Sequence, residues 1–273
     1  MNLFDLPKID GHCHVLDPAR FAFSAQAAYH PAGQELGTAA YFKDVMATYG
    51  TRHALLVGPN SGYASDNRCL LDAIAQGEGR FKGVAVLPAD TGLERLRDLR
   101  GQGIVGVAFN PALHGLEHYA DIDGLLARLA ALDLWAQFQV AGDQLAALLP
   151  RIERAGVRTL IDHCGRPVLA DGPDAPGVRA LRALADSGLG VVKLSGFAKF
   201  SQTGYPFEDA REPVMRLLQA FGPERCIWAS DWPFLRAPYR LDYGTLLQLA
   251  GRWFTPDQCR QMMWEAPARL FGW

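Results

Sequence analysis

The feature that most constrains the fold of this chain is a repeated alternation of short apolar runs with longer Ala/Leu/Arg-rich segments. Most of the apolar runs are almost continuously hydrophobic, as expected of parallel strands that are buried on both faces. Eight runs predict strands, at residues 8–14, 53–58, 82–87, 104–109, 134–140, 157–163, 190–195 and 225–230. Helical periodicity follows most of them, at residues 92–99, 124–132, 143–154, 177–186 and 212–221, with a further helix expected from Asp66.

Eight such alternations predict an α/β fold, a (β/α)8 TIM barrel that residues 1–273 form as a single domain. An open doubly wound sheet is the competitor, but no glycine-rich phosphate-binding fingerprint follows the first predicted strand. Two long loops interrupt the alternation, at residues 15–40 and 196–211. Because the loops after barrel strands carry the chemistry, substrate contacts are expected there.

Composition excludes several classes of function. A formal net charge of -2 leaves no basic field for nucleic acid or for an anionic membrane surface. We find neither a signal peptide nor an apolar run of membrane-spanning length. The five cysteines are scattered and never form a CxxC pair, which argues against a disulfide framework and a structural zinc site. We therefore expect a cytoplasmic protein that acts on a small molecule, and a homo-oligomer is left open because no sequence feature fixes one.

The first predicted strand contains Asp10, His12 and His14 at alternate positions. Side chains alternate between the faces of a strand, so the two imidazoles are expected to point the same way, toward the barrel interior. Two imidazoles at this spacing can bind one divalent metal or polarise one substrate oxygen. The structural alternative is a pair of core histidines whose nitrogens are satisfied by hydrogen bonds.

Two further polar residues end apolar runs. His163 precedes a Gly-Arg-Pro sequence typical of a loop, whereas Asp162 has the opposite parity and is expected to pack or hydrogen-bond outward. Asp231 ends the eighth run, where a carboxylate is costly to bury alone but beside histidines is a competent base or ligand. A turn or helix-capping role before Trp-Pro is its structural alternative. Together with His12 and His14, these positions favour one reaction centre.

The three motifs DxHxH, IDHxGRP and SDWP, in this order, resemble the amidohydrolase superfamily. The chain is most similar to the amidohydrolase-related (amidohydrolase 2) branch, which includes 2-pyrone-4,6-dicarboxylate lactonase. The resemblance runs from about Ile9 to the end of the chain. It implies that Asp231 is the general base that activates water. It also implies that His12, His14 and His163 polarise the substrate carbonyl, orient water or hold a metal, so we expect a hydrolase that opens a small lactone or related cyclic ester.

The resemblance leaves the cofactor open. The metal-rich relatives carry a carbamylated lysine or a glutamate on the fourth strand that bridges two metals, but here this run ends at Asn110 without such a residue. A two-metal centre is therefore not expected. Two alternatives stay open: no cofactor, or one divalent metal, zinc or manganese, held by the set His12, His14, His163 and Asp231.

Departures from the dicarboxylate lactonase pattern bear on the substrate. Those relatives have arginine where this chain has Ala108 and Lys199, and a basic residue near the position of His114. Losing bidentate arginine contacts costs a dicarboxylate about 1.5–3 kcal/mol per charged hydrogen bond. A monoanionic or neutral lactone is therefore our hypothesis. Seven residues are candidates for substrate binding, and for each of them a purely structural role is at least as well supported. They are Tyr29, Ser61, Asn110, His114, Gln137, Arg166 and Lys199.

Two rival functions remain at this point. A metal-dependent nonoxidative decarboxylase of a small aromatic or unsaturated carboxylate shares the same motifs, and it would release CO₂, whereas lactone hydrolysis consumes water and releases a proton. A catalytically silent barrel that serves as a binding or scaffold protein would not bring the histidines and Asp231 together in one pocket.

Overall fold

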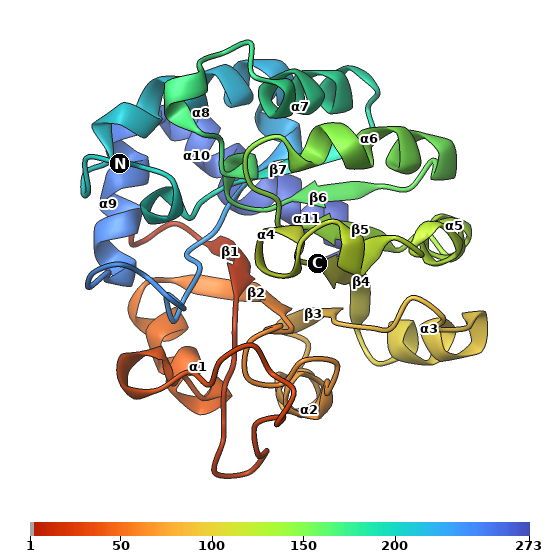
Figure 1. Cartoon of the computed structure of the whole chain (residues 1–273). Coiled ribbons are helices and arrows are strands. Elements are labelled where there is room, and N and C mark those ends of the chain that lie inside the picture. The colour runs from red at the N-terminus through yellow and green to blue at the C-terminus, as the bar shows by residue number, and fades with distance from the viewer. Residues whose placement is uncertain (1–2) are drawn as a thin grey trace. The chain divides into compact units, whose positions relative to one another are not determined.

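The chain separates into two compact units in the computed structural model, which describes residues 3–273. Within these residues, unit 1 comprises residues 3–87, 99–105 and 228–273, and unit 2 comprises residues 88–98 and 106–227. The strands are β1 (Lys8–Cys13), β2 (Thr51–Val57), β3 (Phe81–Ala85), β4 (Ile104–Phe109), β5 (Trp135–Phe138), β6 (Thr159–Ile161), β7 (Gly190–Leu194) and β8 (Cys226–Trp228) (Figure 1).

Helices follow the strands in regular succession. The α-helices are α1 (Ala39–Thr48), α2 (Arg68–Ala75), α3 (Leu93–Gly101), α4 (Pro111–His114), α5 (Asp123–Ala131), α6 (Gln144–Ala155), α7 (Pro176–Asp186), α8 (Glu208–Phe221), α9 (Tyr243–Trp253), α10 (Pro256–Arg260) and α11 (Ala266–Phe271). The short 3-10 helices are η1 (Gly33–Glu35), η2 (Glu117–Tyr119), η3 (His163–Gly165), η4 (Leu169–Asp171), η5 (Phe197–Lys199) and η6 (Pro223–Arg225), and η7 (Gln261–Glu265) is a π-helix.

The strand order in the sheet is β1 through β8, in the order of the chain. The pairs β1–β2, β2–β3, β4–β5, β5–β6 and β6–β7 are all parallel. Eight parallel strands joined in sequence order by helices are the topology of the (β/α)8 barrel, so the predicted fold class is confirmed. That the whole chain acts as a single domain stays a prediction.

Unit 1 contains β1, β2 and β3, with α1 packed on β2 and α2 on β3. The register between β1 and β2 shifts between Asp10 and Cys13, so β1 carries a bulge just before its carboxyl end. Beyond β8 the chain returns to β1 through a parallel bridge between Cys13 and Trp232. The Trp232 ring stacks on Phe42 of α1 with ring centroids 4.7 Å apart, which fixes the segment that follows β8.

Unit 2 contains β5, β6 and β7, with α5 packed on β5 and both α7 and α8 on β7. Its strands are buried along their whole length, as the continuously apolar runs predict. Leu160 of β6 lies opposite both Gln137 of β5 and Val191 of β7, and this register decides which polar side chains share a face.

The predicted elements agree with the structure in order, and their bounds differ at the ends. The strand predicted at residues 104–109 is observed at those residues as β4, whereas β6 and β8 are shorter than the strands predicted at 157–163 and 225–230. The predicted loop at 196–211 ends early, because α8 begins at Glu208 rather than near residue 212. Backbone geometry at strand ends, which apolarity does not encode, makes these differences.

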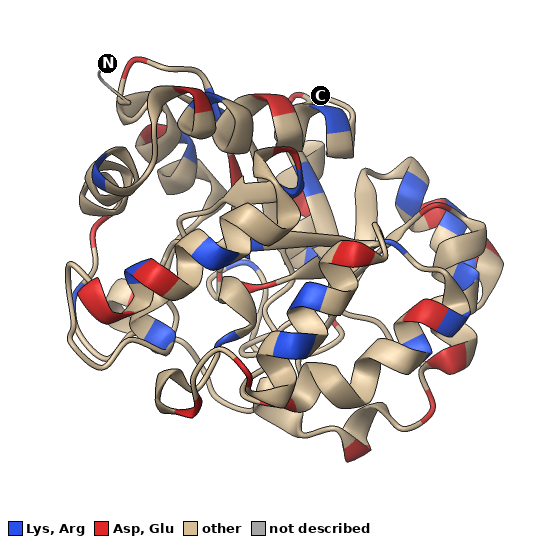
Figure 2. Ribbon diagram, turned by 90° about the horizontal axis from the view of Figure 1, so that it is seen from above, with Lys and Arg blue, Asp and Glu red and all other residues tan. Residues whose placement is uncertain are grey.

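Charged residues of both signs are mixed along the helices. Figure 2 shows lysine and arginine interspersed with aspartate and glutamate rather than gathered by sign. Several of them form ion pairs one helical turn apart, such as Arg95 with Asp98 on α3 and Arg216 with Glu212 on α8. Within residues 3–273, no helix is both long enough and apolar enough to cross a lipid bilayer.

Candidate active site

Three of the predicted residues meet in unit 1. Nε2 of His12 lies 3.2 Å from Nε2 of His14, and the two rings are nearly perpendicular. Oδ1 of Asp231 lies 3.8 Å from Nε2 of His12 and 3.7 Å from Nε2 of His14. All three side chains are buried. Two imidazole nitrogens and one carboxylate oxygen therefore surround one point.

Main-chain hydrogen bonds hold Asp231 beside the two histidines. The Asp231 amide donates to the His12 carbonyl at 2.9 Å, and the His14 amide donates to the Trp232 carbonyl at 2.8 Å. These bonds continue the parallel pairing beyond the end of β8. Asp231 itself has a left-handed backbone with φ 62°, which is uncommon for a non-glycine residue. The segment is thus bent at Asp231 while its backbone stays paired to β1.

Asp10 belongs to the framework of the site rather than to its centre. Its carboxylate accepts from the Ser230 amide at 3.0 Å, the Ser230 hydroxyl at 2.6 Å and the His12 amide at 3.2 Å. Burial raises the pKa of Asp10 to about 6, and these hydrogen bonds oppose the rise. The carboxylate therefore ties the start of the HxH segment to the residue preceding Asp231.

The orientation of His14 is set by a backbone carbonyl. Nδ1 of His14 lies 2.8 Å from the Val57 carbonyl, which only accepts, so this nitrogen carries a proton. In neutral His14 the lone pair is then on Nε2, facing Nε2 of His12. Either a proton on Nε2 of His12 or a bound cation satisfies this lone pair. A carbonyl that fixes the tautomer in this way is the usual partner of a metal-binding histidine.

The donor set fits one divalent cation. The donor atoms of His12, His14 and Asp231 all lie within 4.8 Å of one another. Ligands about 2.0–2.1 Å from a tetrahedral zinc ion are themselves about 3.3 Å apart. Small side-chain movements bring the three observed separations to that value. Nitrogen and carboxylate ligands with a fixed second shell suit zinc and manganese alike.

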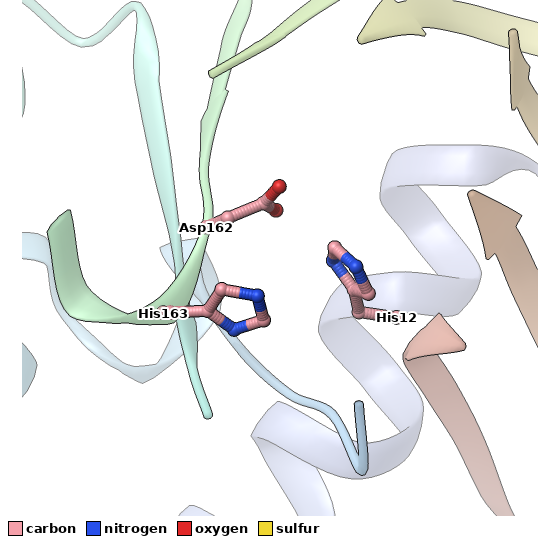
Figure 3. A group of neighbouring side chains, drawn as sticks. All are labelled: His12, Asp162 and His163. Carbon is pink, nitrogen blue, oxygen red and sulfur yellow. The ribbon is translucent and has the colours of Figure 1, made fainter. Parts of the chain in front are cut away.

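His163 lies in unit 2, directly after β6, as the first residue of η3 (Figure 3). Its Nδ1 lies 3.1 Å from the Ser195 hydroxyl. The backbone at His163 is left-handed, with φ 51°, so strand alternation stops there. Gly196 makes room for the ring, because a Cβ at that position would lie 2.4 Å from Nδ1 of His163.

The prediction that Asp162 faces outward is wrong. Its carboxylate accepts from Nε2 of Gln137 at 2.9 Å and lies 3.1 Å from Nζ of Lys193. Lys193 also donates to Oε1 of Gln137 at 2.6 Å, and all three side chains are buried. Asp162 and Lys193 stand two residues beyond Leu160 and Val191, which pair in register with each other. Asp162 therefore shares the face of Gln137.

Two of the predicted substrate-binding residues lie in unit 1 near Asp231. Tyr29 is half-buried and Ser61 is buried, and main-chain hydrogen bonds join the segments that carry them. Burial raises the pKa of Tyr29 to about 12, the Ser61 side chain opposes the rise, and the Asp231 carboxylate adds to it. The electrostatic influence of Asp231 on Tyr29 links this loop to the His12–His14–Asp231 cluster.

The other predicted substrate-binding residues lie in unit 2, and several of them have structural roles. Oδ1 of Asn110 caps α4 by accepting from the Leu113 amide at 3.1 Å. His114 ends α4 and stacks on His118, and burial together with His118 lowers the pKa of His114. The remaining two are half-buried in loops, Arg166 after η3 and Lys199 at the end of η5.

Some contributors to the site were missed by reasoning from the sequence. Ser195 and Gly196 shape the position of His163, and the Val57 carbonyl orients His14. Ser230 links Asp10 to the Asp231 segment. Serine, glycine and backbone carbonyls have no distinctive sequence pattern, so among these positions only Ser230 lay within a motif, Ser-Asp-Trp-Pro.

Comparison with known proteins identifies the family of this chain. Residues 9–273 match the family model described as amidohydrolase. The chain is 31% identical to 4-sulfomuconolactone hydrolase from Hydrogenophaga intermedia, over 96% of this chain and 88% of that protein. A crystal structure of a probable 2-pyrone-4,6-dicarboxylic acid hydrolase from Acinetobacter baumannii, with citric acid bound, superposes with a TM-score of 0.86 at 26% identity. This match covers 97% of this chain and 99% of that one.

The decarboxylase is more distant. The structure of 2,6-dihydroxybenzoate decarboxylase from Rhizobium has a TM-score of 0.65 at 13% identity, over 97% of this chain and 98% of that one, and so shows a common fold alone. The family match, by contrast, spans β1 to the C-terminal helix and includes all three histidines and Asp231. This chain belongs to the amidohydrolase family.

Proposed function

We propose that this protein is a hydrolase that opens a small lactone or related cyclic ester. The observation that carries the proposal is the carboxylate of Asp231 placed 3.7 and 3.8 Å from two imidazole nitrogens. A buried carboxylate beside imidazoles is suited to take a proton from water. The relatives support the substrate class, because the curated protein and the solved structure described above are both hydrolases of lactone-type substrates by name.

In the proposed reaction Asp231 removes a proton from water while the oxygen attacks the lactone carbonyl carbon. The C–O bond of the ring then breaks, and the proton passes from Asp231 to the departing ring oxygen. The new carboxylic acid ionises at neutral pH, so one proton is released per turnover. Water is the only co-reactant, and Asp231 ends in the state in which it began.

We propose that His163 completes the site with His12, His14 and Asp231. The support is the fold class, since a (β/α)8 barrel builds its reaction centre at the carboxyl ends of its strands and from the loops after them. His12 lies near the end of β1, His14 follows it, and His163 and Asp231 follow β6 and β8. With the Ser195 hydroxyl donating to Nδ1, the proton of neutral His163 is on Nε2. That nitrogen can donate a hydrogen bond to the carbonyl oxygen as negative charge develops there.

We further propose that His12, His14 and Asp231 hold one divalent metal, zinc or manganese. His163 is a candidate fourth ligand in its other tautomer, in which Nδ1 donates to the Ser195 hydroxyl and Nε2 carries the lone pair. The facing nitrogens of the two histidines support a cation between them. A divalent metal bound there supplies Lewis-acid activation of water and of the carbonyl. Asp231 then serves both as ligand and as proton acceptor, and His14 keeps its orientation through the Val57 carbonyl.

The test is a proton-release assay over a panel of neutral and carboxylated lactones, with and without strong chelation. It is run on the wild-type protein, on Asp231→Asn, and on Asp242→Asn as a matched control, because Asp242 is an exposed partner of Arg240. We expect turnover that Asp231→Asn reduces about 10²–10⁴-fold, the usual contribution of a general base, while Asp242→Asn retains it. Chelation should remove the activity, and zinc or manganese should restore it.

The outcomes separate the alternatives. Turnover that survives chelation yet is lost in Asp231→Asn supports a metal-free lactonase and overturns the metal proposal. If no lactone is opened but an aromatic or unsaturated carboxylate yields CO₂, the hydrolase proposal is wrong and the protein is a decarboxylase. Undiminished turnover in Asp231→Asn contradicts the role of this carboxylate.

The cellular compartment, the domain organisation and the oligomeric state are also proposals. All five cysteines are buried and none forms a disulfide within residues 3–273, which supports a reducing compartment such as the cytoplasm. We propose that residues 1–273 act as one domain on a small molecule. A homo-oligomer stays a prediction that light scattering on the purified protein tests.

A further inference from the structure

Three loops of unit 1 are tied together beside the His12–His14–Asp231 cluster. The loop after β1 is joined to the loop after β2, because the Gly62 amide donates to the Tyr29 carbonyl at 2.9 Å and the Ser24 amide to the Gly62 carbonyl at 2.7 Å. The loop after β8 is joined to the first loop, because the Arg236 amide donates to Oε1 of Glu35 at 2.5 Å. These bonds fix the side chains that the loops carry relative to one another.

The hydroxyl of Tyr29 is buried and lies beside the Ser61 side chain, but it forms no well-aligned hydrogen bond within residues 3–273. A buried hydroxyl without a partner is costly, and such groups in native structures call for an explanation. Burial raises the pKa of Tyr29 to about 12, so the hydroxyl keeps its proton at neutral pH and is able to donate. Ser61 lies close enough to oppose that rise, and it offers a second hydroxyl at the same place.

Arg236 supplies positive charge at this position. Its guanidinium carbon lies 5.3 Å from the centre of the Tyr29 ring. No carboxylate among residues 3–273 forms an ion pair with it, whereas the neighbouring Arg240 pairs with Asp242 at 3.2 Å. The nearby Glu35 carboxylate is occupied by backbone amides, those of Arg236 and of Ala32.

The backbone after Asp231 places Arg236 there. The Phe234 amide donates to the Asp231 carbonyl at 2.7 Å, and the Ala237 amide donates to the Phe234 carbonyl at 3.0 Å. Phe234 and Arg236 both have left-handed backbones, with φ 69° and 54°. Two consecutive turns therefore fold this loop back toward Tyr29, at a cost in backbone strain that an unremarkable surface loop has no need to carry.

We propose that Arg236 is a specificity-determining residue, which together with the Tyr29 hydroxyl binds a carboxylate or sulfonate group of the substrate. A guanidinium with a free face and a neutral hydroxyl donor match the oxygens of such a group. The inference rests on the proposed lactone hydrolysis and deepens it. Recognition of one anionic group is thereby assigned to the loop after β8.

The test compares two butenolide substrates that differ in one group, a carboxymethyl substituent or the corresponding primary amide. The variants are Arg236→Gln, Arg236→Lys as the charge-retaining change, and Arg240→Gln as the matched control on the same loop. We expect Arg236→Gln to lower kcat/KM about 10- to 100-fold for the carboxylate, the loss of one or two charge-assisted hydrogen bonds. For the amide, kcat/KM should stay within about 2-fold, Arg236→Lys should recover part of the loss, and Arg240→Gln should alter neither substrate.

Calorimetric binding of the corresponding carboxymethyl lactam, which is not hydrolysed under these conditions, separates this inference from the proposed function. Weaker binding to Arg236→Gln supports the inference even if the wild-type protein opens no lactone, in which case the proposed function alone falls. Lactone turnover with equal losses on both substrates, or with none on either, overturns the inference and leaves the function standing. A wild-type protein that neither binds the lactam nor opens a lactone overturns both.

Discussion

Oδ1 of Asp231 lies 3.7 Å from Nε2 of His14, on an aspartate and a histidine separated by most of the chain. The contact exists because the segment after β8 pairs with the end of β1 through the His12 and Trp232 carbonyls. The other nitrogen of His14 is held by the Val57 carbonyl at 2.8 Å. The carboxylate and the two imidazoles are therefore positioned by backbone that surrounds them on both sides.

Metal binding should stabilise the folded protein. At a free metal concentration of one hundred times Kd, a ligand that binds only the folded state adds about 2.7 kcal/mol. For a chain of this size that corresponds to a rise in Tm of about 5–10 °C. We expect zinc or manganese to raise the Tm of the chelator-treated protein, and His12→Asn or His14→Asn to abolish the rise while His30→Asn retains it. An unchanged Tm across all metals argues against the site.

Lys193→Met should destabilise the protein strongly. The Lys193 side chain is fully buried and contacts both Asp162 and Gln137, so its removal leaves the Asp162 carboxylate without its buried counter-charge. Breaking one partner of a buried pair costs about 3–5 kcal/mol. The measurement is denaturant unfolding at neutral pH.

A double variant and a surface control sharpen that prediction. Asp162→Asn combined with Lys193→Met should recover part of the stability, because the uncompensated charge is then absent. Arg95→Ala removes an exposed ion pair with Asp98 and should cost at most about 1 kcal/mol. A Lys193→Met protein as stable as Arg95→Ala would show that the Gln137–Asp162–Lys193 network contributes little.

Gly196→Ala should impair both activity and stability. Both Gly196 and Gly188 have left-handed backbones, with φ 63° and 75°, so an alanine at either position costs about 1–2 kcal/mol of backbone strain. Only at Gly196 does the new Cβ fall 2.4 Å from Nδ1 of His163, whereas at Gly188 it meets nothing within 4 Å. We expect a larger loss of Tm for Gly196→Ala than for Gly188→Ala, because the buried His163 side chain must move, and at least a roughly 10-fold lower kcat/KM for Gly196→Ala alone. Equal kcat/KM in the two variants would show that the position of the His163 ring does not affect catalysis.

His53 should make the fold sensitive to acid. Burial lowers the pKa of His53 below the ordinary value of about 6.5, with Lys82 and Arg80 contributing, while a backbone hydrogen bond to Gly79 opposes the shift. The unfolded chain therefore binds a proton that the folded protein resists, so stability is lost as the pH falls below about 6.5. His53→Phe keeps a ring against Trp273, whose centroid lies 5.3 Å away, and removes the titration. The free energy of unfolding should then vary less between pH 7 and pH 5 than in the wild-type protein, and an identical slope would contradict this.

Local sequence determined the elements of this protein and their order. Continuous apolar runs predict buried parallel strands because both faces of β5, β6 and β7 must be covered, and helical periodicity between them follows from the same need. The residues of the candidate site could also be predicted from the sequence. Polar side chains are costly to bury without partners, and the positions in or at the ends of apolar runs that stand out for this reason are those of His12, His14, His163 and Asp231.

Tertiary structure decided the contacts and the orientations. Alternation along a strand predicts that Asp162 points outward. In the structure, the registers of β5, β6 and β7 instead bring it into contact with Gln137 and Lys193. The approach of Arg236 to Tyr29 depends on left-handed turns and on an amide bond to Glu35, and none of these is encoded in residue type at either position. Sequence specifies which groups are present at the ends of the strands, and pairing between distant segments, a property of the whole fold, specifies which of them meet.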